Sequence, residues 1–239
     1  DVDGDGINDL FLPVVQDSLG NNIPPVIFKS DGTGQFTKLV IPELANETIV
    51  TRSVKIIDVN NDGLNDLFLT RSSSNDLLLT KNSDGTYSKT LFSEYAQGGL
   101  PGGNWIDYDN DGYLDLFANT SLGAGTASDK YLLHSNGDGT FTRITEGELV
   151  TDFGFTYDTQ WADYDNDGDP DVIVLNRGIN PSVQSNSRLY KNNGDGTFTR
   201  VLGSVFETIL SYDRTASWGD YDNDGDMDIF IGSQSLNTN

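Results

Sequence analysis

Five short acidic loops carry the residues of this chain whose types and spacing could do chemistry. Each loop has an oxygen-bearing side chain at positions 1, 3, 5 and 9 and a glycine at position 6, as in DVDGDGIND at the start of the chain. Carboxylates this close repel one another unless a cation lies between them. The residues at these four positions are Asp1, Asp3, Asp5 and Asp9; Asp58, Asn60, Asp62 and Asp66; Asp107, Asp109, Asp111 and Asp115; Asp163, Asp165, Asp167 and Asp171; and Asp220, Asp222, Asp224 and Asp228. The loops are therefore candidate cation sites.

The donor set favours Ca²⁺ as the cation. Alternating oxygen donors around a glycine bend suit a hard ion with about six to eight ligands, and the backbone carbonyl of position 7 would add another. The residues at position 7 are Ile7, Leu64, Tyr113, Asp169 and Asp226. Mg²⁺ prefers a tighter octahedron, and zinc or copper would call for histidine or cysteine, of which the chain has one and none. We expect up to five Ca²⁺ ions, one in each loop.

The alternative is that these loops are solvated turns, because Asp and Gly favour turns without any metal. A single copy would leave that choice open. Five copies at fixed spacing favour a metal, because each copy again brings several uncompensated carboxylates together.

The composition agrees with a folded protein whose natural partners are cations. The chain has 239 residues, with 37 Asp and Glu against 14 Lys and Arg, and a formal net charge of −23. Nucleic acids and anionic membrane surfaces are therefore not expected as partners. An apolar content of 36% is enough for a core, and no apolar run is long enough to predict membrane insertion.

The acidic loops recur because the chain is built from a repeated unit. Repeats start near residues 1, 58, 107, 163 and 220, and an Asp-Gly turn recurs between the loops, as in NNGDGTF. Each repeat reads as four short strands: one before the acidic loop, an apolar one such as DVIVLN after it, a third, and a fourth beyond the Asp-Gly turn. This pattern predicts an all-β fold, a β-propeller of four-stranded antiparallel blades; a single β-sandwich is the second choice.

Tryptophan recurs at one place in the predicted first strand. Trp105, Trp161 and Trp218 each stand two residues before the first aspartate of a loop, and Ile56 has that place in the second repeat. We expect these side chains to pack between blades rather than to stack on sugars.

The repeats resemble the FG-GAP/VCBS repeat family. WADYDNDGDPDVI and WGDYDNDGDMDIF are similar to its motif WxDYDNDGDxDLF, whereas the first two copies have Val2 and Val59 in place of the tyrosine. The resemblance implies a secreted or surface-exposed propeller, usually seven-bladed and similar to the calcium-bearing blades of integrin α-subunits, that serves adhesion or ligand recognition. Residues 1–239 would then be one region of about four and a half blades, an arc of a larger propeller truncated at both ends. We expect the second loop, with Asn60, to bind calcium most weakly, and the first loop to bind it less well than the later three.

A binding function is the leading expectation. The variable connections lie on the blade face opposite the acidic loops, and variable loops on a rigid scaffold are where recognition is usually found. The candidate contacts to a glycan or protein ligand are Tyr95, Phe155, Tyr157, Arg177, Tyr212 and Arg214. A purely structural repeat of a surface or extracellular assembly is the alternative, and a polysaccharide-lyase-like enzyme is less favoured.

No catalytic residues are expected. The only histidine, His134, aligns with Lys29, Thr80 and Lys191 at one place in the third strand, which indicates a repeat-surface position. The carboxylates that could act as acid and base are assigned to the metal, and no serine nucleophile elbow or phosphate-binding glycine loop occurs. Because free calcium is millimolar outside cells, an extracellular or cell-surface location is expected.

Overall fold

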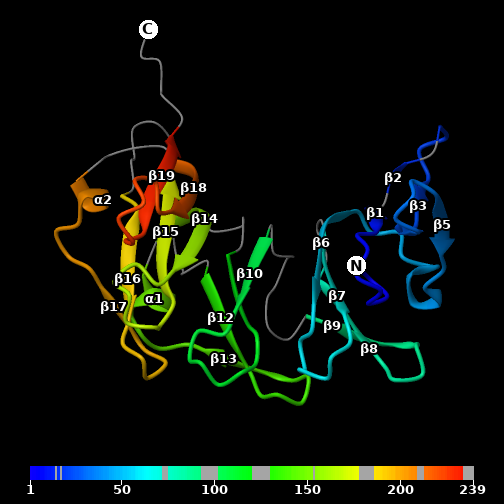
Figure 1. Ribbon diagram of the computed structural model, residues 1–239, viewed down its shortest axis with the longest axis horizontal. Coiled ribbons are helices and arrows are strands. Elements are labelled where there is room, and N and C mark those ends of the chain that lie inside the picture. Colours follow the sequence, from blue (N-terminus) through cyan, green and yellow to red (C-terminus); the bar gives the residue numbers. More distant parts are fainter. Residues whose placement is uncertain are drawn as a thin grey trace, which may run out of the picture. The chain divides into compact units, whose positions relative to one another are not determined.

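The fold is almost entirely β-structure. A computed structural model describes residues 1–13, 15–16, 18–71, 75–92, 102–119, 130–152, 154–177, 186–208 and 213–233 (Figure 1). The chain divides into two compact units, of which the first comprises Asp1–Gly102 with Ser135–Phe141 and the second comprises Gly103–His134 with Thr142–Asn239.

Each repeat folds into an antiparallel sheet whose strands follow one another in chain order. The three complete sheets each contain four strands, in the order β6-β7-β8-β9, β10-β11-β12-β13 and β14-β15-β16-β17. Their bounds are β6 Thr51–Ile57, β7 Asp66–Arg71, β8 Leu77–Lys81 and β9 Tyr87–Leu91; β10 Gly102–Ile106, β11 Asp115–Asn119, β12 Lys130–Ser135 and β13 Phe141–Ile144; and β14 Phe155–Ala162, β15 Asp171–Arg177, β16 Arg188–Asn192 and β17 Phe198–Arg200.

The first and last repeats form smaller sheets in the described residues. The first has the order β1-β4-β5, and the last pairs β18 with β19. Their bounds are β1 Leu10–Leu12, β4 Val26–Ser30, β5 Phe36–Leu39, β18 Asp213–Gly219 and β19 Asp228–Ser233. The predicted all-β fold of antiparallel, four-stranded propeller-type blades is thus confirmed, whereas the count of seven blades stays a prediction.

Strand register places the acidic loops of the second, fourth and fifth repeats in the same way. The residue before the loop pairs with the aspartate at position 9, as in Ile57 with Asp66 and Ala162 with Asp171. Position 9 is therefore the first residue of the second strand. Its carboxylate lies at the closed end of the hairpin, next to the loop that it ends.

The second strand of a blade is buried on both faces. Alternate residues of a strand point to opposite faces of a sheet, so β15 can contact a neighbour on each side. Val172 belongs to a core cluster with Phe117 of β11, and Ile173 belongs to a second cluster with Ala216 of β18. All of β7 is buried as well. This explains why these strands read as nearly continuous apolar runs.

Trp161 packs between blades, as predicted. Its ring meets the ring of Phe117 edge-on, with centroids 5.5 Å apart, and the ring of Phe198 at 5.8 Å. Trp218 packs against the cluster that contains Ile173. These contacts bury part of the tryptophan surface in the blade core.

The structure adds short elements that the sequence pattern did not predict. A small hairpin, β2 (Val15–Gln16) with β3 (Asn22–Ile23), lies in the first variable connection. Short helical turns follow the fourth strand of three repeats: η1 (Pro42–Leu44), α1 (Glu148–Thr151) and α2 (Val205–Thr208). Among the described residues, none of the helices has the length and apolar content that a membrane crossing requires.

Candidate metal centres

The aspartate at position 1 holds each acidic loop closed. In the first loop, Asp1 Oδ1 accepts hydrogen bonds from the N–H groups of Gly4 (2.7 Å) and Asp5 (3.1 Å), and Oδ2 accepts one from Gly6 N–H (2.7 Å). The same bonds from positions 5 and 6 recur in the other four loops, to Asp58, Asp107, Asp163 and Asp220. The first aspartate therefore organises the backbone as well as contributing charge.

Two positions in each loop adopt the left-handed backbone conformation. The position 6 glycines have φ between 81° and 96°, which glycine tolerates without a steric penalty. Position 4 is also left-handed, with Gly4 in the first loop (φ 86°) and Asn61, Asn110, Asn166 and Asn223 in the others (φ 56° to 62°). Position 4 was not among the predicted residues of the loop. Its signal is the repeated asparagine, which adopts this conformation more readily than other non-glycine residues.

In the three complete repeats, the aspartate at position 9 is buried and joins the acidic loop to the second and third strands. In the fourth loop, Asp171 Oδ2 accepts a hydrogen bond from Tyr164 N–H (3.1 Å), and Oδ1 accepts one from Asn192 N–H of β16 (2.8 Å). Asp66, Asp115 and Asp171 are all 0% exposed. Burial raises the pKa of Asp171 to about 6 and also raises the pKa of Asp66. A buried carboxylate of this kind is stabilised in its charged form by a nearby cation.

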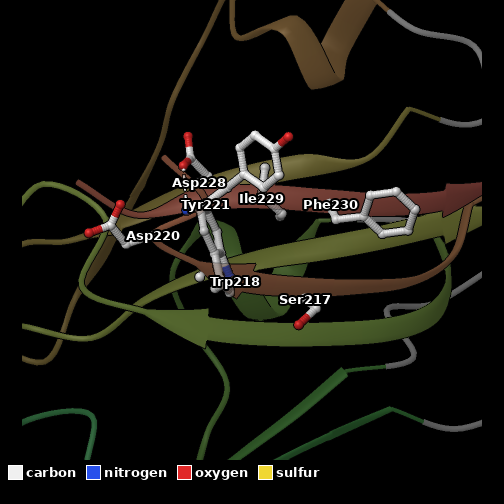
Figure 2. A pocket seen from close by; sticks show the side chains of 8 residues that line it. Ser217, Trp218, Asp220, Tyr221, Asp228, Ile229 and Phe230 are labelled. Atoms are coloured by element: carbon white, nitrogen blue, oxygen red, sulfur yellow. Dashed lines mark hydrogen bonds between the residues drawn. The ribbon is translucent and has the colours of Figure 1, made fainter. Parts of the chain in front are cut away.

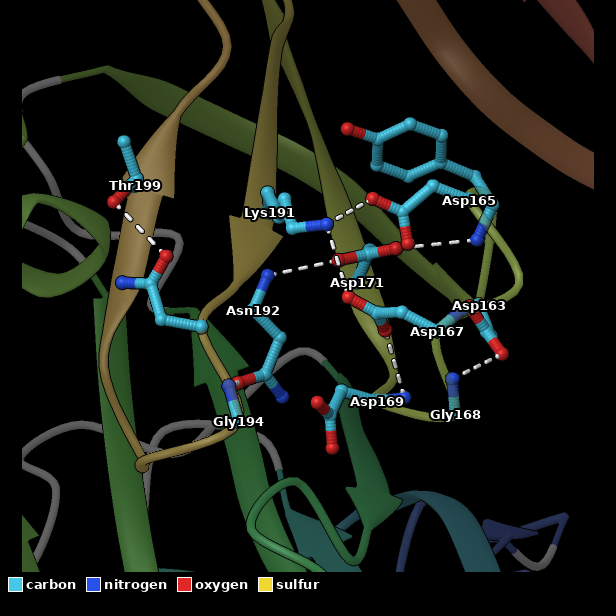
Figure 3. A network of polar contacts seen from close by, with 12 residues as sticks. Asp163, Asp165, Asp167, Gly168, Asp169, Asp171, Lys191, Asn192, Gly194 and Thr199 are labelled. Carbon is cyan, nitrogen blue, oxygen red and sulfur yellow. Dashed lines mark hydrogen bonds and ion pairs between the residues drawn. The ribbon is translucent and has the colours of Figure 1, made fainter.

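The carboxylates at positions 3 and 5 converge, and a side chain from the third strand contacts both of them. In the fourth loop, Lys191 Nζ lies 2.9 Å from Asp167 Oδ2 and forms an ion pair with Asp165 Oδ2 (Figure 3). These contacts raise the pKa of the lysine, and the hydrogen bond from Lys191 lowers the pKa of Asp167. The Lys191 ammonium therefore already lies at the point where these carboxylate oxygens converge.

The first loop repeats this arrangement. Lys29 Nζ lies 3.0 Å from Asp5 Oδ2 and also pairs with Asp3 Oδ2. The hydrogen bond from Lys29 lowers the pKa of Asp5. Because Lys29 and Lys191 have the same place in the third strand, the ion pairs belong to the architecture of the repeat. The contact between these lysines and the loops was not predicted from their alignment.

Predicted ligand residues come together in four of the five loops. Three oxygen atoms, one from each residue, lie within 4.8 Å of one another in the sets Asp1, Asp3 and Asp5; Asp107, Asp109 and Asp111; Asp163, Asp165 and Asp171; and Asp220, Asp222 and Asp228. In the described residues of the second loop, no three carboxylates meet in this way, because Asn60 replaces one of them. Asn60 instead donates a hydrogen bond to Asp62 Oδ2 (3.0 Å).

The oxygen at position 3 is left without a partner in three loops. Asp3 Oδ1, Asn60 Oδ1 and Asp109 Oδ1 are buried atoms that accept no hydrogen bond from the described residues. A buried oxygen without a partner costs free energy, and coordination to a metal ion would remove that cost. The donor chemistry of the loops therefore fits a hard cation at this point.

Side chains at position 7 connect neighbouring loops in the second unit. Asp169 Oδ1 accepts a hydrogen bond from Asn110 Nδ2 of the preceding loop (2.7 Å), and Asp226 Oδ1 accepts one from Asn166 Nδ2 (3.1 Å). The position 4 asparagines therefore have a second role, which is contact between loops. The predicted use of the position 7 carbonyls as ligands stays a prediction.

His134 has the predicted repeat position and is partly exposed, but its ring faces the acidic loop rather than open solvent. Its side chain is only 28% exposed, and Nδ1 lies 3.2 Å from Asp109 Oδ2 and 3.4 Å from Asp115 Oδ1. Nε2 lies 3.9 Å from Asp111 Oδ2. The alignment with Lys29, Thr80 and Lys191 was correct, but this place in the third strand faces the acidic loop because strands two and three are hydrogen-bonded neighbours.

The Asp-Gly turn lies beside the acidic loop in the fourth repeat. A Cβ atom built on Gly194 would lie 2.6 Å from Asp169 Oδ2 (Figure 3). Within the turn, Asp195 Oδ1 accepts hydrogen bonds from Thr197 N–H (3.1 Å) and Oγ1 (2.5 Å). The hydrogen bond from the Thr197 hydroxyl lowers the pKa of Asp195, so the turn is stabilised without a metal.

The predicted ligand-recognition residues are only partly described. Tyr95 and Tyr212 lie outside the described residues. Tyr157 on β14 is 44% exposed. Phe155 and Arg177 are paired across β14 and β15, and Arg214 lies in β18. The structure therefore brings together the backbones of Phe155 and Arg177, at the open end of the β14–β15 hairpin, opposite the acidic loop.

An apolar pocket lies on the last strand pair. Figure 2 shows Trp218, Tyr221, Ile229 and Phe230 around it. Phe230 is 75% exposed, whereas Ile173, at the same place in β15, is 0% exposed and packs in the cluster that contains Ala216 of β18. Among the described residues no third strand pairs with β19. The pocket is not assigned to a ligand.

Comparison with known proteins agrees with the repeat architecture. Four segments, residues 1–69, 58–118, 107–174 and 178–231, match a protein-family model described as "FG-GAP-like repeat". Comparison with curated proteins found no match. The matched segments cover nearly all of the sequence and include all five acidic loops. The chain therefore belongs to the family of FG-GAP-like repeats.

Proposed function

We propose that this chain is a non-catalytic, calcium-binding repeat module that works outside the cell in adhesion or ligand recognition. The observation that carries the calcium proposal is the convergence of carboxylate oxygens within each loop. In four loops, three such oxygens lie within 4.8 Å of one another. Backbone N–H groups donate to the carboxylates at positions 1 and 9 and to one oxygen at position 5, so the oxygens at position 3 and the second oxygen at position 5 are available to a cation.

Ca²⁺ fits this donor set better than the lysine ammonium does. An ammonium has one charge and three donors, whereas Ca²⁺ has two charges and takes about six to eight oxygen ligands. The side chain of Lys191 is 38% exposed, so it can move into solvent when an ion enters the loop. In this proposal, Lys29 and Lys191 neutralise their loops in the absence of calcium and are displaced by it.

The proposed location follows from the ion. Exposed loops with few rigid ligands bind calcium in the range found in extracellular modules, so a calcium-rich environment would keep them loaded. Bound calcium would reduce the formal charge of −23 and the repulsion that goes with it. The recognition surface proposed for a glycan or protein is the blade edge with Tyr157, Phe155 and Arg177. A purely structural repeat is the competing proposal.

Direct measurement of calcium binding tests the first part. Tag-free protein would be freed of metal with EDTA and titrated with Ca²⁺ by calorimetry, while thermal unfolding is followed by circular dichroism. We expect binding of several ions, and a melting temperature that Ca²⁺ raises more than the same concentration of Mg²⁺ does. No bound calcium and identical melting curves in Ca²⁺ and EDTA would refute the proposal.

Paired variants separate a loop ligand from a general charge effect. Asp165→Asn removes a carboxylate that faces the cation position, whereas Asp195→Asn makes the same charge change in an Asp-Gly turn whose hydrogen bonds asparagine can keep. We expect only Asp165→Asn to lower the number or affinity of bound ions. An equal effect of both variants would show that net charge, not coordination, attracts calcium.

Glycan and protein arrays in calcium buffer test the recognition part. Binding that is weakened by Tyr157→Ala while calcium titration is unchanged would support the proposed surface. Absence of any binding by the calcium-loaded protein would favour the structural-repeat proposal.

A further inference from the structure

The third loop differs from the first and fourth loops because an imidazole nitrogen, rather than a lysine ammonium, points into it. His134 replaces the lysines found at this place in the first and fourth repeats and Thr80 of the second. Its ring is held edge-on against Tyr108, with centroids 6.3 Å apart. Imidazole is a common ligand of zinc and related metals, whereas an ammonium group cannot coordinate a metal at all.

The distances around His134 match those between ligands of one small metal ion. Ligand bonds to zinc are about 2.0 to 2.2 Å long, so two ligands at a tetrahedral angle lie roughly 3.3 to 3.5 Å apart. His134 Nδ1 is 3.2 Å from Asp109 Oδ2 and 3.4 Å from Asp115 Oδ1. The three ligand atoms of Asp109, Asp115 and His134 all lie within 4.8 Å of one another. Calcium has longer bonds of about 2.3 to 2.6 Å, but its six to eight ligands are more crowded and also lie at roughly this separation, so the nitrogen donor rather than the spacing favours a transition metal.

Two buried atoms at this point have no hydrogen bond within the described part of the chain. They are His134 Nδ1 and Asp109 Oδ1. The side chain of Asp115 is 0% exposed, and its Oδ2 accepts a hydrogen bond from Tyr108 N–H (3.2 Å), which directs Oδ1 toward His134. A metal bound to Nδ1 would satisfy the buried nitrogen.

The other ring nitrogen has a suitable neighbour. A histidine that binds a metal through one nitrogen usually directs its other N–H toward a carboxylate or carbonyl. Asp111 Oδ2 lies 3.9 Å from His134 Nε2, on that side of the ring. The ring therefore presents Nδ1 to the proposed ligands and Nε2 to a further carboxylate, which is beyond direct hydrogen-bond distance.

We propose that the third loop is a site for Zn²⁺ or a similar divalent transition metal, with Asp109, Asp115 and His134 Nδ1 as protein ligands, while the other loops take Ca²⁺. This inference rests on the proposed function in one respect, which is that the acidic loops hold metal ions. It goes further by assigning a different class of ion to one loop. The competing account is that His134 acts as a positive charge, like Lys29 and Lys191.

The single histidine makes the test specific. In protein labelled with ¹⁵N at histidine, every ring signal comes from His134. The tag-free protein would first be saturated with Ca²⁺ at pH 7.5, and Zn²⁺ would then be added to one equivalent. We expect the Nδ1 signal to move to the position of a metal-bound nitrogen and to saturate at one equivalent. An unchanged signal after one equivalent of Zn²⁺ would overturn the proposal.

Two variants that copy sibling repeats provide the controls. His134→Lys installs the residue of the first and fourth repeats, and His134→Thr installs that of the second. We expect both to weaken zinc binding measured by calorimetry at least about a hundredfold while the calcium bound by the other loops is kept. Zinc binding of unchanged affinity in either variant would contradict the proposal. The labelled wild-type protein gives the answer if a variant does not fold.

The two proposals fail in different ways. If the protein binds Ca²⁺ but His134 does not respond to Zn²⁺, only the zinc assignment is wrong. If His134 responds to Zn²⁺ and no calcium is bound, the zinc site stands and the calcium function is wrong.

Discussion

Replacement of Asp171 by asparagine separates the structural role of the position 9 carboxylate from its role in binding a cation. The side chain is 0% exposed and accepts backbone hydrogen bonds on both oxygens, from Tyr164 (3.1 Å) and Asn192 (2.8 Å). Asparagine has almost the same shape but carries no charge and has only one acceptor oxygen. Asp171→Asn therefore changes the charge and one hydrogen bond while leaving the packing of the loop nearly intact.

Without metal, the two effects of Asp171→Asn oppose each other. The lost hydrogen bond leaves a buried N–H group unsatisfied, which costs about 1 to 3 kcal/mol. Burial raises the pKa of Asp171 to about 6, so its charge at neutral pH costs roughly 3 kcal/mol, which the variant is spared. We expect the free energy of unfolding in EDTA to change by less than about 2 kcal/mol.

With calcium, the effect has one direction. An ion present at a hundred times its dissociation constant stabilises the folded protein by about 2.7 kcal/mol for each site. The variant loses most of this gain at the fourth loop, which for a chain of this size lowers the melting temperature in calcium by about 5 to 10 °C. The assay is thermal unfolding of both proteins in Ca²⁺ and in EDTA, with Asp195→Asn as the charge-matched control.

The difference between the two buffers decides the result. If Asp171→Asn gains as much stability from calcium as the wild-type protein does, position 9 does not help to bind the ion. If the control variant loses the same calcium-dependent stability as Asp171→Asn, the effect comes from net charge.

Three further predictions concern packing, pH and the lysines. A Cβ atom on Gly103 would lie 2.6 Å from Leu116 Cδ1 in the core, so Gly103→Ala should lower the free energy of unfolding in urea by about 1 to 3 kcal/mol. Gly219→Ala is the control and should have little effect, because a Cβ atom there would have no neighbour within 4 Å. Equal effects of the two variants would contradict the packing argument. Because burial raises the pKa of Asp171 to about 6, the folded state binds more protons than the unfolded state between about pH 4 and pH 6. The metal-free protein should therefore melt at a higher temperature at pH 5 than at pH 7, and a lower melting temperature at pH 5 would show that this carboxylate does not control the trend. Lys191→Met removes the ammonium that pairs with the carboxylates of the fourth loop, so the calcium affinity of this loop, measured by calorimetric titration, should rise severalfold. Unchanged or weaker calcium binding would show that the lysine does not compete with the ion.

Most of the architecture could be predicted from local sequence. The four strands of each complete repeat follow from short apolar runs, Asp-Gly turns and the regular spacing of the loops. The hairpin at Val15–Gln16 and Asn22–Ile23 and the helices at Glu148–Thr151 and Val205–Thr208 were not predicted. Segments of two to four residues are too short to show a strand or helix period, and packing against the blades decides their conformation.

The parts of the candidate site that lie close together in the chain could be predicted from the sequence. Ligand positions 1, 3, 5 and 9 could be identified because they lie within nine residues of one another and recur five times. The left-handed conformation at position 4 was not predicted, although the asparagine that recurs there, as at Asn110, is typical of it. The recognition candidates Tyr95 and Tyr212 stay predictions, since they lie outside the described residues.

The sequence by itself determined the repeat, the strands and the acidic loops with their oxygen donors, because these depend on residues close together in the chain. Only the tertiary structure decided what enters each loop. Lys191 reaches Asp165 from 26 residues away, and Asn110 reaches Asp169 across 59 residues. Such contacts depend on the pairing of strand three with strand two and on the packing of one blade against the next. For that reason, a histidine that looked like a surface residue in the alignment lies among three carboxylates in the folded protein.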